Sequence, residues 1–410
     1  MQNLIYRTSS VFWKMIGFLF KNVGHFVPMD KHLVLLGGMG GRFYGDNSAH
    51  LYEWLLKNEK EIKPYWVTKN KELVKSLQKS GKPVLYQFSL SFILKLLRAY
   101  ALCFTNSLKD VAPSGHLIPS RTRVLYLTHD IAPKRSRYAR VGHPIDKFQE
   151  EQFKLERRVV TDYISTSPFI SRCRAEALKV PEEWFEITGL PRNDVLVRRK
   201  DDRSKEHLVY EDGSKPDQVI LYAPTWRSGR APVKLFPFED LEREKLLSFL
   251  EENNVMLMLR CHKNDLQYAE VRELIEWMCE GQKHIIDGTH GKYGDINTVL
   301  PEVDLLITDY SGLLHDYLLL DRPSILVPYD LEEFERTNGF FYDLREYAPG
   351  PMIDNFHNFL KEVESAIKGH EEYENYRKEL LKLVHTFADD KSCERVTQLI
   401  KSSQKDDGAT

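Results

Sequence analysis

The chain has 410 residues, of which 42% are hydrophobic and 29% are charged. This length exceeds what one hydrophobic core usually organises, so we expect two domains, and the composition excludes a mainly disordered, collagen-like or multi-span membrane protein. The 58 Lys and Arg residues nearly balance the 60 Asp and Glu residues, so a generally basic nucleic-acid-binding protein is not expected. The five cysteines are scattered without a CxxC pair, which argues against a zinc site or a disulfide framework.

The first 28 residues contain an apolar run that ends at Lys21. It is shorter than the about 20 apolar residues that cross a bilayer, and no signal-peptide cleavage site follows it. At helical spacing one face is apolar, and it comprises Phe12, Met15, Ile16, Leu19 and Phe20. Another face carries Arg7, Lys14 and Lys21. Because of this cationic face, we favour a helix lying in a membrane interface; the alternative is a helix docked on the protein's own core.

The rest of the chain alternates short apolar runs with amphipathic stretches. In the first half we expect strands at 31–38, 65–68, 83–86, 101–105, 124–127, 163–166 and 185–188, and helices at 48–56 and 73–77. After a charged stretch at 198–218 we expect strands at 219–222, 255–259, 284–287, 305–308 and 324–327, and helices within 373–401. Such alternation produces parallel sheets covered by helices. The sequence therefore predicts an α/β protein in which two Rossmann-like halves face a cleft.

The expected domain boundaries follow from this pattern. They are an interfacial segment at 1–28, a first Rossmann-like domain at 29–200, a linker at 201–218, a second Rossmann-like domain at 219–390, and a helix end with a tail at 391–410. No G-x-G-x-x-G motif opens either half, and the glycine-rich run 37–41 is either a phosphate-binding loop or a flexible exit from a strand. P-loop, H-E-x-x-H and G-x-S-x-G motifs are absent, which argues against those classes of NTPase, zinc protease and esterase.

Polar residues follow three expected strands of the second half. After the strand at 305–308, hydroxyls and amides at a helix start near Ser311 would bind an anion, and an ordinary helix cap is the alternative. After the strand at 255–259, Arg260 and His262 would clamp a pyrophosphate and stabilise a leaving phosphate; a surface histidine is the alternative. The stretch 223–227 follows the strand at 219–222 and is either a ligand contact or a helix-start turn.

In the first half, His129 follows the strand at 124–127. The ordinary pKa of an imidazole allows it to act as a general base near neutral pH. Four cations follow it and would either attract an anionic acceptor or form a solvated basic loop: Lys134, Arg135, Arg137 and Arg140. The stretch 189–194 follows the strand at 185–188. All these candidates lie after expected strands, which is where open α/β sheets bind their ligands.

Several of these strings together resemble one family. They are 189–194 (GLPRND), 222–227 (YAPTWR), 308–311 (TDYS), 318–323 (LLLDRP), 328–333 (PYDLEE) and 347–351 (YAPGP). In this order they resemble the CDP-glycerol glycerophosphotransferases, which prime or extend the poly(glycerol phosphate) of teichoic acids. The resemblance runs through most of 31–390. It implies a GT-B fold, an acceptor domain at 29–200, a CDP-polyol-binding domain at 219–390, and a peripheral position on the cytoplasmic face of the cell membrane.

The resemblance also implies roles for individual residues. His129 stands where the family has its base, and His262 where a second cleft histidine binds the phosphates. The nucleotide–glycerol contacts fall on Arg192, Pro224, Thr225, Arg260, Ser311, Gly312 and Asp316. Further candidates beside them are Asp130, Asn193, Arg227 and Asp309.

Three positions depart from the family pattern. Asp130 replaces a glycine after the base and adds negative charge near a diphosphate. Lys263 replaces the proline after the second histidine, and Gly312 replaces a serine, which keeps an amide but loses a hydroxyl. These changes leave the transferase chemistry in place and open the identity of the donor and the acceptor.

We therefore expect a transfer of glycerol phosphate from CDP-glycerol to the hydroxyl of a membrane-linked saccharide or polyol-phosphate acceptor, with release of CMP. CDP-ribitol is the alternative donor. The sequence is also compatible with a GT-B glycosyltransferase that uses a nucleotide sugar, and with a non-catalytic, membrane-docked nucleotide-binding protein. No metal-ligand cluster is evident in the sequence, although Mg²⁺ commonly accompanies diphosphates and is left open.

Overall fold

The computed structural model describes residues 16–17, 26–131, 134–142, 144–227, 231–289, 293–370 and 372–402. Its first half is a parallel sheet of seven strands in the order β3-β2-β1-β4-β5-β6-β7. The strands are β1 (Asp30–Gly37), β2 (Lys63–Thr68), β3 (Val84–Tyr86), β4 (Ala99–Phe104), β5 (Arg123–Tyr126), β6 (Asp162–Ser165) and β7 (Phe185–Ile187). The helices are α2 (Asp46–Asn58), α3 (Lys71–Lys79), α4 (Leu90–Arg98), α5 (Lys147–Val159), α6 (Pro168–Leu178) and α7 (Asp194–Arg198).

The second half is a parallel sheet of five strands in the order β10-β9-β8-β11-β12. The strands are β8 (Gln218–Tyr222), β9 (Val255–Leu259), β10 (Ile285–Asp287), β11 (Leu305–Thr308) and β12 (Ser324–Leu326). The helices are α8 (Arg243–Glu252), α9 (Ala269–Cys279), α10 (Ile296–Val299), α11 (Gly312–Tyr317), α12 (Leu331–Thr337), α13 (Phe356–Ile367), α14 (Glu374–Val384) and α15 (Ser392–Lys401). In both sheets the first strand of the half lies inside, and the order reverses beside it, as in a doubly wound fold.

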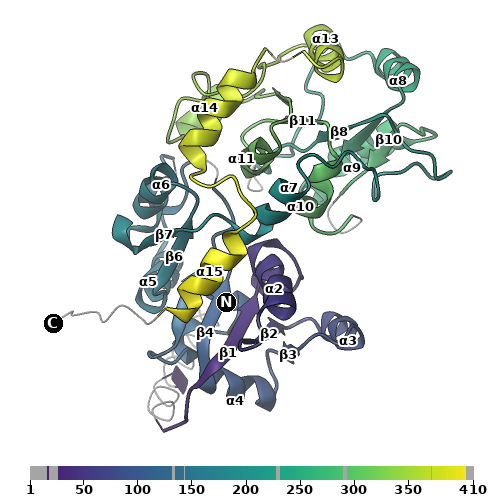
Figure 1. Cartoon of the computed structure of the whole chain (residues 1–410). Helices are drawn as coiled ribbons and strands as arrows, with labels where there is room; N and C mark the ends of the chain where they lie inside the picture. Colours follow the sequence, from purple (N-terminus) through teal and green to yellow (C-terminus); the bar gives the residue numbers. More distant parts are fainter. Residues whose placement is uncertain are drawn as a thin grey trace.

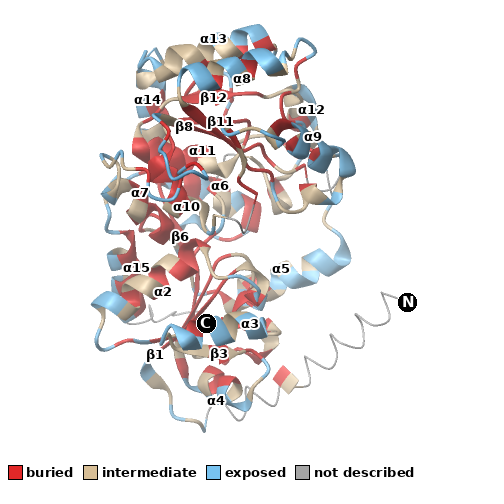
Figure 2. Ribbon diagram, turned by 90° about the vertical axis from the view of Figure 1, so that its right-hand side faces the viewer, coloured by how far each residue is buried: buried red, intermediate tan, exposed pale blue. Residues whose placement is uncertain are grey.

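Burial on both faces explains the composition of the strands. Every residue of β9 is buried, and the run Val255–Leu259 is wholly apolar. Figure 2 shows central strands such as β8 and β11 buried inside the molecule, with exposed surface on outer helices such as α5 and α13. Strands that are covered by helices on both faces read as continuous apolar runs rather than alternating ones. The strands predicted from such runs are therefore confirmed, to within a residue or two at their ends.

The last helix returns to the first half of the molecule. In Figure 1, α15 lies beside α2, away from the second sheet. The backbone N–H groups of Ser392 and Cys393 both donate to the buried carboxylate of Asp194, at 2.9 Å each. A carboxylate that accepts two amides at a helix start stabilises that start. The helices predicted within 373–401 are confirmed, while the assignment of residues to domains stays a prediction.

Of the predicted N-terminal amphipathic helix, only Ile16 and Gly17 and residues 26–28 lie within the described residues. Ile16 is half-buried against the core of the first half, and Gly17 is close-packed on His116. Across the described ranges, no helix combines the length and the apolar character needed to span a bilayer.

Candidate active site

His129 lies three residues after β5, at the carboxyl end of the first sheet. Its Nδ1 is 2.5 Å from Oδ2 of Asp46, the first residue of α2, and 52% of its side chain is exposed. A carboxylate accepts hydrogen bonds, so Nδ1 carries the proton and Nε2 holds the lone pair in the neutral ring. This tautomer presents a basic nitrogen away from Asp46, as a general base requires.

The pKa of His129 is set by two opposing effects. Partial desolvation disfavours the imidazolium and lowers the pKa, but the negative charge of Asp46 and its hydrogen bond raise it by more, so the pKa lies above its ordinary value. Burial raises the pKa of Asp46, but the Arg192 guanidinium and His129 together lower it by more, so this carboxyl is held ionised. The pair therefore couples a permanent negative charge to a readily protonated ring.

Two strained backbone conformations place this pair. Asp46 has φ 61° and Thr128, which precedes His129, has φ 47°, both in the left-handed region. For residues with a side chain this conformation costs about 1–3 kcal/mol, and it persists where the surroundings enforce it. Asn47 supplies that enforcement, because its Nδ2 donates to the backbone oxygens of Leu127 at 3.1 Å and Thr128 at 2.8 Å. The same contacts between the start of α2 and the loop after β5 thus hold both His129 and Asp46.

Arg192 joins the histidine network to the second half of the molecule. Its guanidinium donates to Asp46 Oδ1 at 2.7 Å, to the backbone oxygen of His129 at 2.6 Å and to Asp316 Oδ2 at 2.9 Å. Arg192 and Asp316 are 5% and 2% exposed. The structure therefore brings together two predicted contact residues, and two carboxylates already engage the guanidinium.

Arg260 and His262 follow β9 on the other half. Arg260 is 9% exposed, and its guanidinium donates to the backbone oxygens of Gly288 at 2.8 Å and Gly294 at 3.3 Å. Burial lowers its pKa, and the negative charge of Asp295 opposes this effect. Two carbonyls do not neutralise a guanidinium, so this side chain is prepared for an anion.

The ring of His262 stacks on Trp226, with centroids 5.1 Å apart and planes at 20°. Its Nδ1 accepts the N–H of Asn264 at 3.2 Å, so in the neutral ring the proton is on Nε2. His262 therefore offers a donor where His129 offers an acceptor. A donor is what a developing phosphate charge requires.

The helix start predicted at Ser311 is present. The Ser311 hydroxyl accepts the N–H of Leu313 at 3.3 Å, and α11 begins at Gly312. Beside it, Asp309 Oδ1 accepts the N–H of Thr225 at 2.8 Å, which ties the loop 223–227 to the end of β11. Arg227 is 2.8 Å from Asp309 and 2.7 Å from Asp330. Arg227 and Asp309 thus hold the loop that carries Pro224 and Thr225.

Asp295 of the second half contacts α2 of the first half. The sequence analysis singled out neither Asp295 nor Asp46 as a candidate site residue. The N–H of Asp46 donates to Asp295 Oδ2 at 2.6 Å, and His50 Nε2 lies 3.5 Å from the same oxygen. His50 and backbone amides lower the pKa of Asp295 despite its burial. Hydrogen bonds connect His129 to Asp46 and Asp46 to Asp295, and the charge of Asp295 acts on Arg260. These interactions link the predicted base to the predicted phosphate-binding cation. In the sequence, Asp46 and Asp295 look like ordinary helix caps, so nothing distinguished them.

The basic run after His129 is largely neutralised. Lys134 pairs with Asp130 at 3.2 Å, which also balances the charge that replaces the family's glycine. Arg135 pairs with Glu176 at 2.9 Å, and Arg137 pairs with Glu156 at 2.5 Å. Arg140 donates to Asn338 Oδ1 at 2.7 Å. These side chains hold loops in place through their partners. Neither prediction for this run, an anion-attracting site or a solvated basic loop, describes these contacts.

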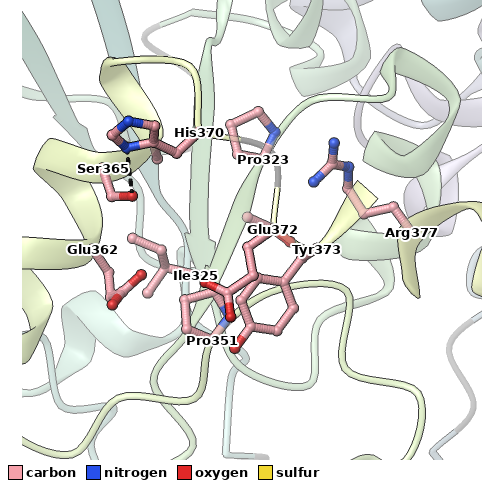
Figure 3. Close-up of a pocket in the computed structure, with 11 residues that line it drawn as sticks. Pro323, Ile325, Pro351, Glu362, Ser365, His370, Glu372, Tyr373 and Arg377 are labelled. Atoms are coloured by element: carbon pink, nitrogen blue, oxygen red, sulfur yellow. Dashed lines mark hydrogen bonds between the residues drawn. The ribbon is translucent and has the colours of Figure 1, made fainter. Parts of the chain in front are cut away.

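Two other features lie apart from these residues. One is a cavity of about 30 Å³, room for about one water. Ile325, Tyr373 and the hydrogen-bonded pair Ser365 and His370 line it (Figure 3). Among the described residues, the one group with metal-ligand spacing is Glu206, His207 and Glu302. Backbone amides of 206–208 already donate to Glu302, so its carboxylate acts as a cap.

The predicted contact residue Asn193 is buried, and its Oδ1 accepts a hydrogen bond from Nδ2 of Asn297 at 3.5 Å.

The two parallel sheets, each with polar residues at its carboxyl edge, form an α/β fold of GT-B-like type. The chain is 26% identical to the teichoic acid glycerol-phosphate transferase of Staphylococcus aureus, covering 90% of this chain and 93% of that protein. It is 26% identical to the teichoic acid poly(ribitol-phosphate) polymerase of Bacillus spizizenii, covering 94% of this chain and 59% of that protein. A solved structure of the wall teichoic acid polymerase TagF has a TM-score of 0.75 at 20% identity, covering 97% of this chain and 95% of that one.

The family model described as CDP-Glycerol:Poly(glycerophosphate) glycerophosphotransferase matches residues 19–402. The chain belongs to this family. The GT-B-like fold, the family resemblance and the assignment as a glycerophosphotransferase of teichoic acid synthesis are confirmed.

Proposed function

We propose that this glycerophosphotransferase uses His129 as the general base toward a terminal hydroxyl of a lipid-linked acceptor. The acceptor oxygen forms a bond to the glycerol-bearing β-phosphorus of CDP-glycerol, and the bond from that phosphorus to the bridging oxygen breaks. CMP leaves with the bridging oxygen, and the hydroxyl proton passes to Nε2 of His129. CMP is a competent leaving group, so positioning and charge stabilisation carry most of the rate enhancement.

The observation that carries this proposal is the pairing of His129 with Asp46. The 2.5 Å contact fixes the proton on Nδ1 and leaves Nε2 as the base. The same carboxylate stabilises the imidazolium that forms when the proton is transferred, as an orienting acid does in a catalytic triad. Arg192 and Asp316 act as positioning residues, because Arg192 holds both Asp46 and the backbone of His129.

The leaving side of the reaction falls to the second half. Arg260 and the Nε2–H of His262 hold the diphosphate and stabilise CMP as it departs. The amides at Gly312, next to the Ser311 cap, add donors at the same edge of the sheet. Pro224 and Thr225 contact the donor from a loop that Asp309 and Arg227 fix. Asp130 and Asn193 support neighbouring loops through Lys134 and Asn297.

The donor is CDP-glycerol in this proposal, and CDP-ribitol is the second candidate because ribitol-phosphate polymerases are among the relatives. A CMP-release assay with both donors and with lipid-linked acceptors tests it. We expect CMP and a phosphodiester-extended acceptor with CDP-glycerol. Turnover with CDP-ribitol alone would reassign the donor. Release of a nucleoside diphosphate from nucleotide sugars, with no CMP from either donor, would contradict the transferase chemistry proposed here.

We also propose a peripheral position on the cytoplasmic face of the membrane, mediated by the amphipathic pattern of residues 1–28. The support is the cationic and apolar faces of that segment. Contact of Ile16 and Gly17 with the first domain is what the docked-helix alternative predicts. Deleting residues 1–28 should move the protein from sedimenting anionic vesicles to the supernatant. Unchanged sedimentation would favour the docked helix.

A further inference from the structure

Four cations from distant parts of the sequence gather at the carboxyl edge of the first sheet. Arg42 follows β1, Lys69 follows β2, and Lys109 lies in the loop after β4. Lys263 comes from the second half, directly after His262, and its Nζ lies 4.2 Å from the ring centroid of Phe43. The group therefore spans both halves beside the proposed active site.

The backbones of the first three converge on Gly41. The N–H of Lys69 donates to the Gly41 oxygen at 2.8 Å, and Asn70 Nδ2 donates to the Arg42 oxygen at 3.2 Å. A Cβ on Gly41, which has φ 70°, would lie 3.4 Å from the Lys109 oxygen and 3.7 Å from the Lys69 nitrogen. Only a glycine fits this conformation and this close approach without strain. The glycine-rich run thus allows the backbone segments that carry Arg42, Lys69 and Lys109 to pack closely together.

The amides of this run are not available to a phosphate. The N–H of Gly40 donates to Asp110 Oδ1 at 2.7 Å, and the N–H of Met39 donates to the Asn106 side chain at 3.3 Å. Asp110 is fully buried, and its other oxygen accepts the N–H groups of Thr105, Asn106 and Ser107. Of the two interpretations of the run 37–41, the structure favours the strand exit.

The cluster Arg42, Lys69, Lys109 and Lys263 carries an excess of positive charge. In the part of the chain that the structure describes, none of the four makes an ion pair with a carboxylate. Burial, then the like charges of Arg42 and Lys109, lower the pKa of Lys69, and Asp110 opposes them only in part. Burial and Arg42 lower the pKa of Lys263. A concentration of uncompensated cations beside a cleft attracts anions.

We propose that this cluster binds the phosphate groups of the anionic acceptor. The inference rests on the proposed function, since it supplies the acceptor side of that reaction. Three of the four cations belong to the half that carries His129, and Arg42 is four residues from Asp46. Arg260, the cation that the proposed function assigns to the donor, in contrast follows β9 of the second half. A polyol-phosphate chain offers phosphates at regular intervals, which a spread of four cations engages better than a single diphosphate does.

The test is direct binding of a soluble oligo(glycerol phosphate) of defined length to the full chain without donor, at low ionic strength. The triple variant R42Q/K69Q/K109Q should bind it at least about tenfold more weakly, because it loses three of the four proposed cation–phosphate contacts. Added salt should weaken binding to the wild type much more than to the variant. The Kd of CDP-glycerol should change by less than about twofold, since the donor contacts are elsewhere. K263Q should weaken oligomer binding in the same direction, by a smaller factor.

A matched variant, K245Q/K368Q/K382Q, removes three exposed charges of the second half that pair with glutamates. It should bind the oligomer as the wild type does, which separates the cluster from overall charge. Unchanged oligomer binding in R42Q/K69Q/K109Q, with a native melting temperature, would overturn the inference. A loss of CDP-glycerol binding instead would assign the cluster to the donor. Because binding is measured without turnover, absence of CMP release from the wild type would count against the proposed function alone.

Discussion

The two candidate histidines, His129 and His262, are the same residue type held in opposite tautomers. His129 donates a hydrogen bond from Nδ1–H to the Asp46 carboxylate, whose charge raises the pKa of the ring, and Nε2 is then an acceptor in the neutral ring. His262 stacks on Trp226, and its Nδ1 accepts the N–H of Asn264, which places the proton of the neutral ring on Nε2. The partner of one nitrogen thus decides what the other can do. One imidazole is suited to take a proton and the other to stabilise negative charge.

The strongest test of this contrast is removal of the base. His129→Ala should lower the rate of CMP release by about 10²–10⁴-fold, because general base catalysis supplies about that much. The Kd of CDP-glycerol should change little, since the proposed donor contacts of Arg260 and His262 lie on the other half. His357→Ala, which removes an exposed histidine of α13, is the control and should retain the wild-type rate. Near wild-type turnover by His129→Ala would show that another group takes the proton.

Removal of the second histidine should have a different signature. His262→Ala should lower the rate by about 10²–10³-fold, the usual effect of losing one donor to a developing charge. It should also weaken CDP-glycerol binding, which His129→Ala should not. Measuring the donor Kd for both variants by calorimetry therefore separates the two roles. Equal effects of the two substitutions on donor binding would contradict the separate roles proposed for His129 as a base and for His262 as a hydrogen-bond donor to the phosphate.

Asp46→Asn tests the origin of the difference. Without the carboxylate, the pKa of His129 should fall, because the charge that raises it is gone. A base is inactive when protonated, so the acid limb of kcat/KM against pH should move to lower pH in the variant. The maximal rate should fall by about 10–10²-fold as the ring loses its orienting partner. An acid limb at the wild-type pH would indicate that Asp46 serves the fold rather than the base.

Two buried histidines, in a third kind of environment, affect the stability of the fold. His315 and His385 are buried, and burial lowers their pKa values to about 3 and about 4. Between these values and the ordinary 6.5 of an unfolded histidine, the unfolded chain binds more protons, so stability is lost as the pH falls below about 6.5. Each should contribute a loss of about 2 kcal/mol at pH 5. His385→Gln should reduce the difference in unfolding free energy between pH 7 and pH 5; an unchanged difference would contradict this.

Much of the fold could be predicted because its determinants are local. Continuous apolar runs such as 255–259 identify strands that helices cover on both faces, and their alternation with amphipathic stretches implies parallel sheets. The carboxyl ends of the strands of a sheet meet at one edge, and this position alone made His129, Arg260 and Ser311 candidate site residues. The family strings added the order of these sites.

The cations show where this reasoning fails. The run 134–140 looks like a binding site because its charges are adjacent in sequence, yet Glu156, Glu176 and Asp130 pair with three of them. Arg42 and Lys109 look like ordinary surface cations because they lie far apart in the sequence. Charge is balanced in space, so neither outcome is visible along the chain.

Local sequence was enough to predict the two parallel sheets and the residues that follow their strands at the carboxyl edge. Three features emerged only from the folded chain: the carboxylate that orients His129, the nitrogen of each histidine that keeps its lone pair, and the cations that stay unbalanced. Periodicity and apolar burial are properties of neighbours in the chain. Hydrogen bonds and electrostatic balance depend on side chains that meet only after the chain has folded.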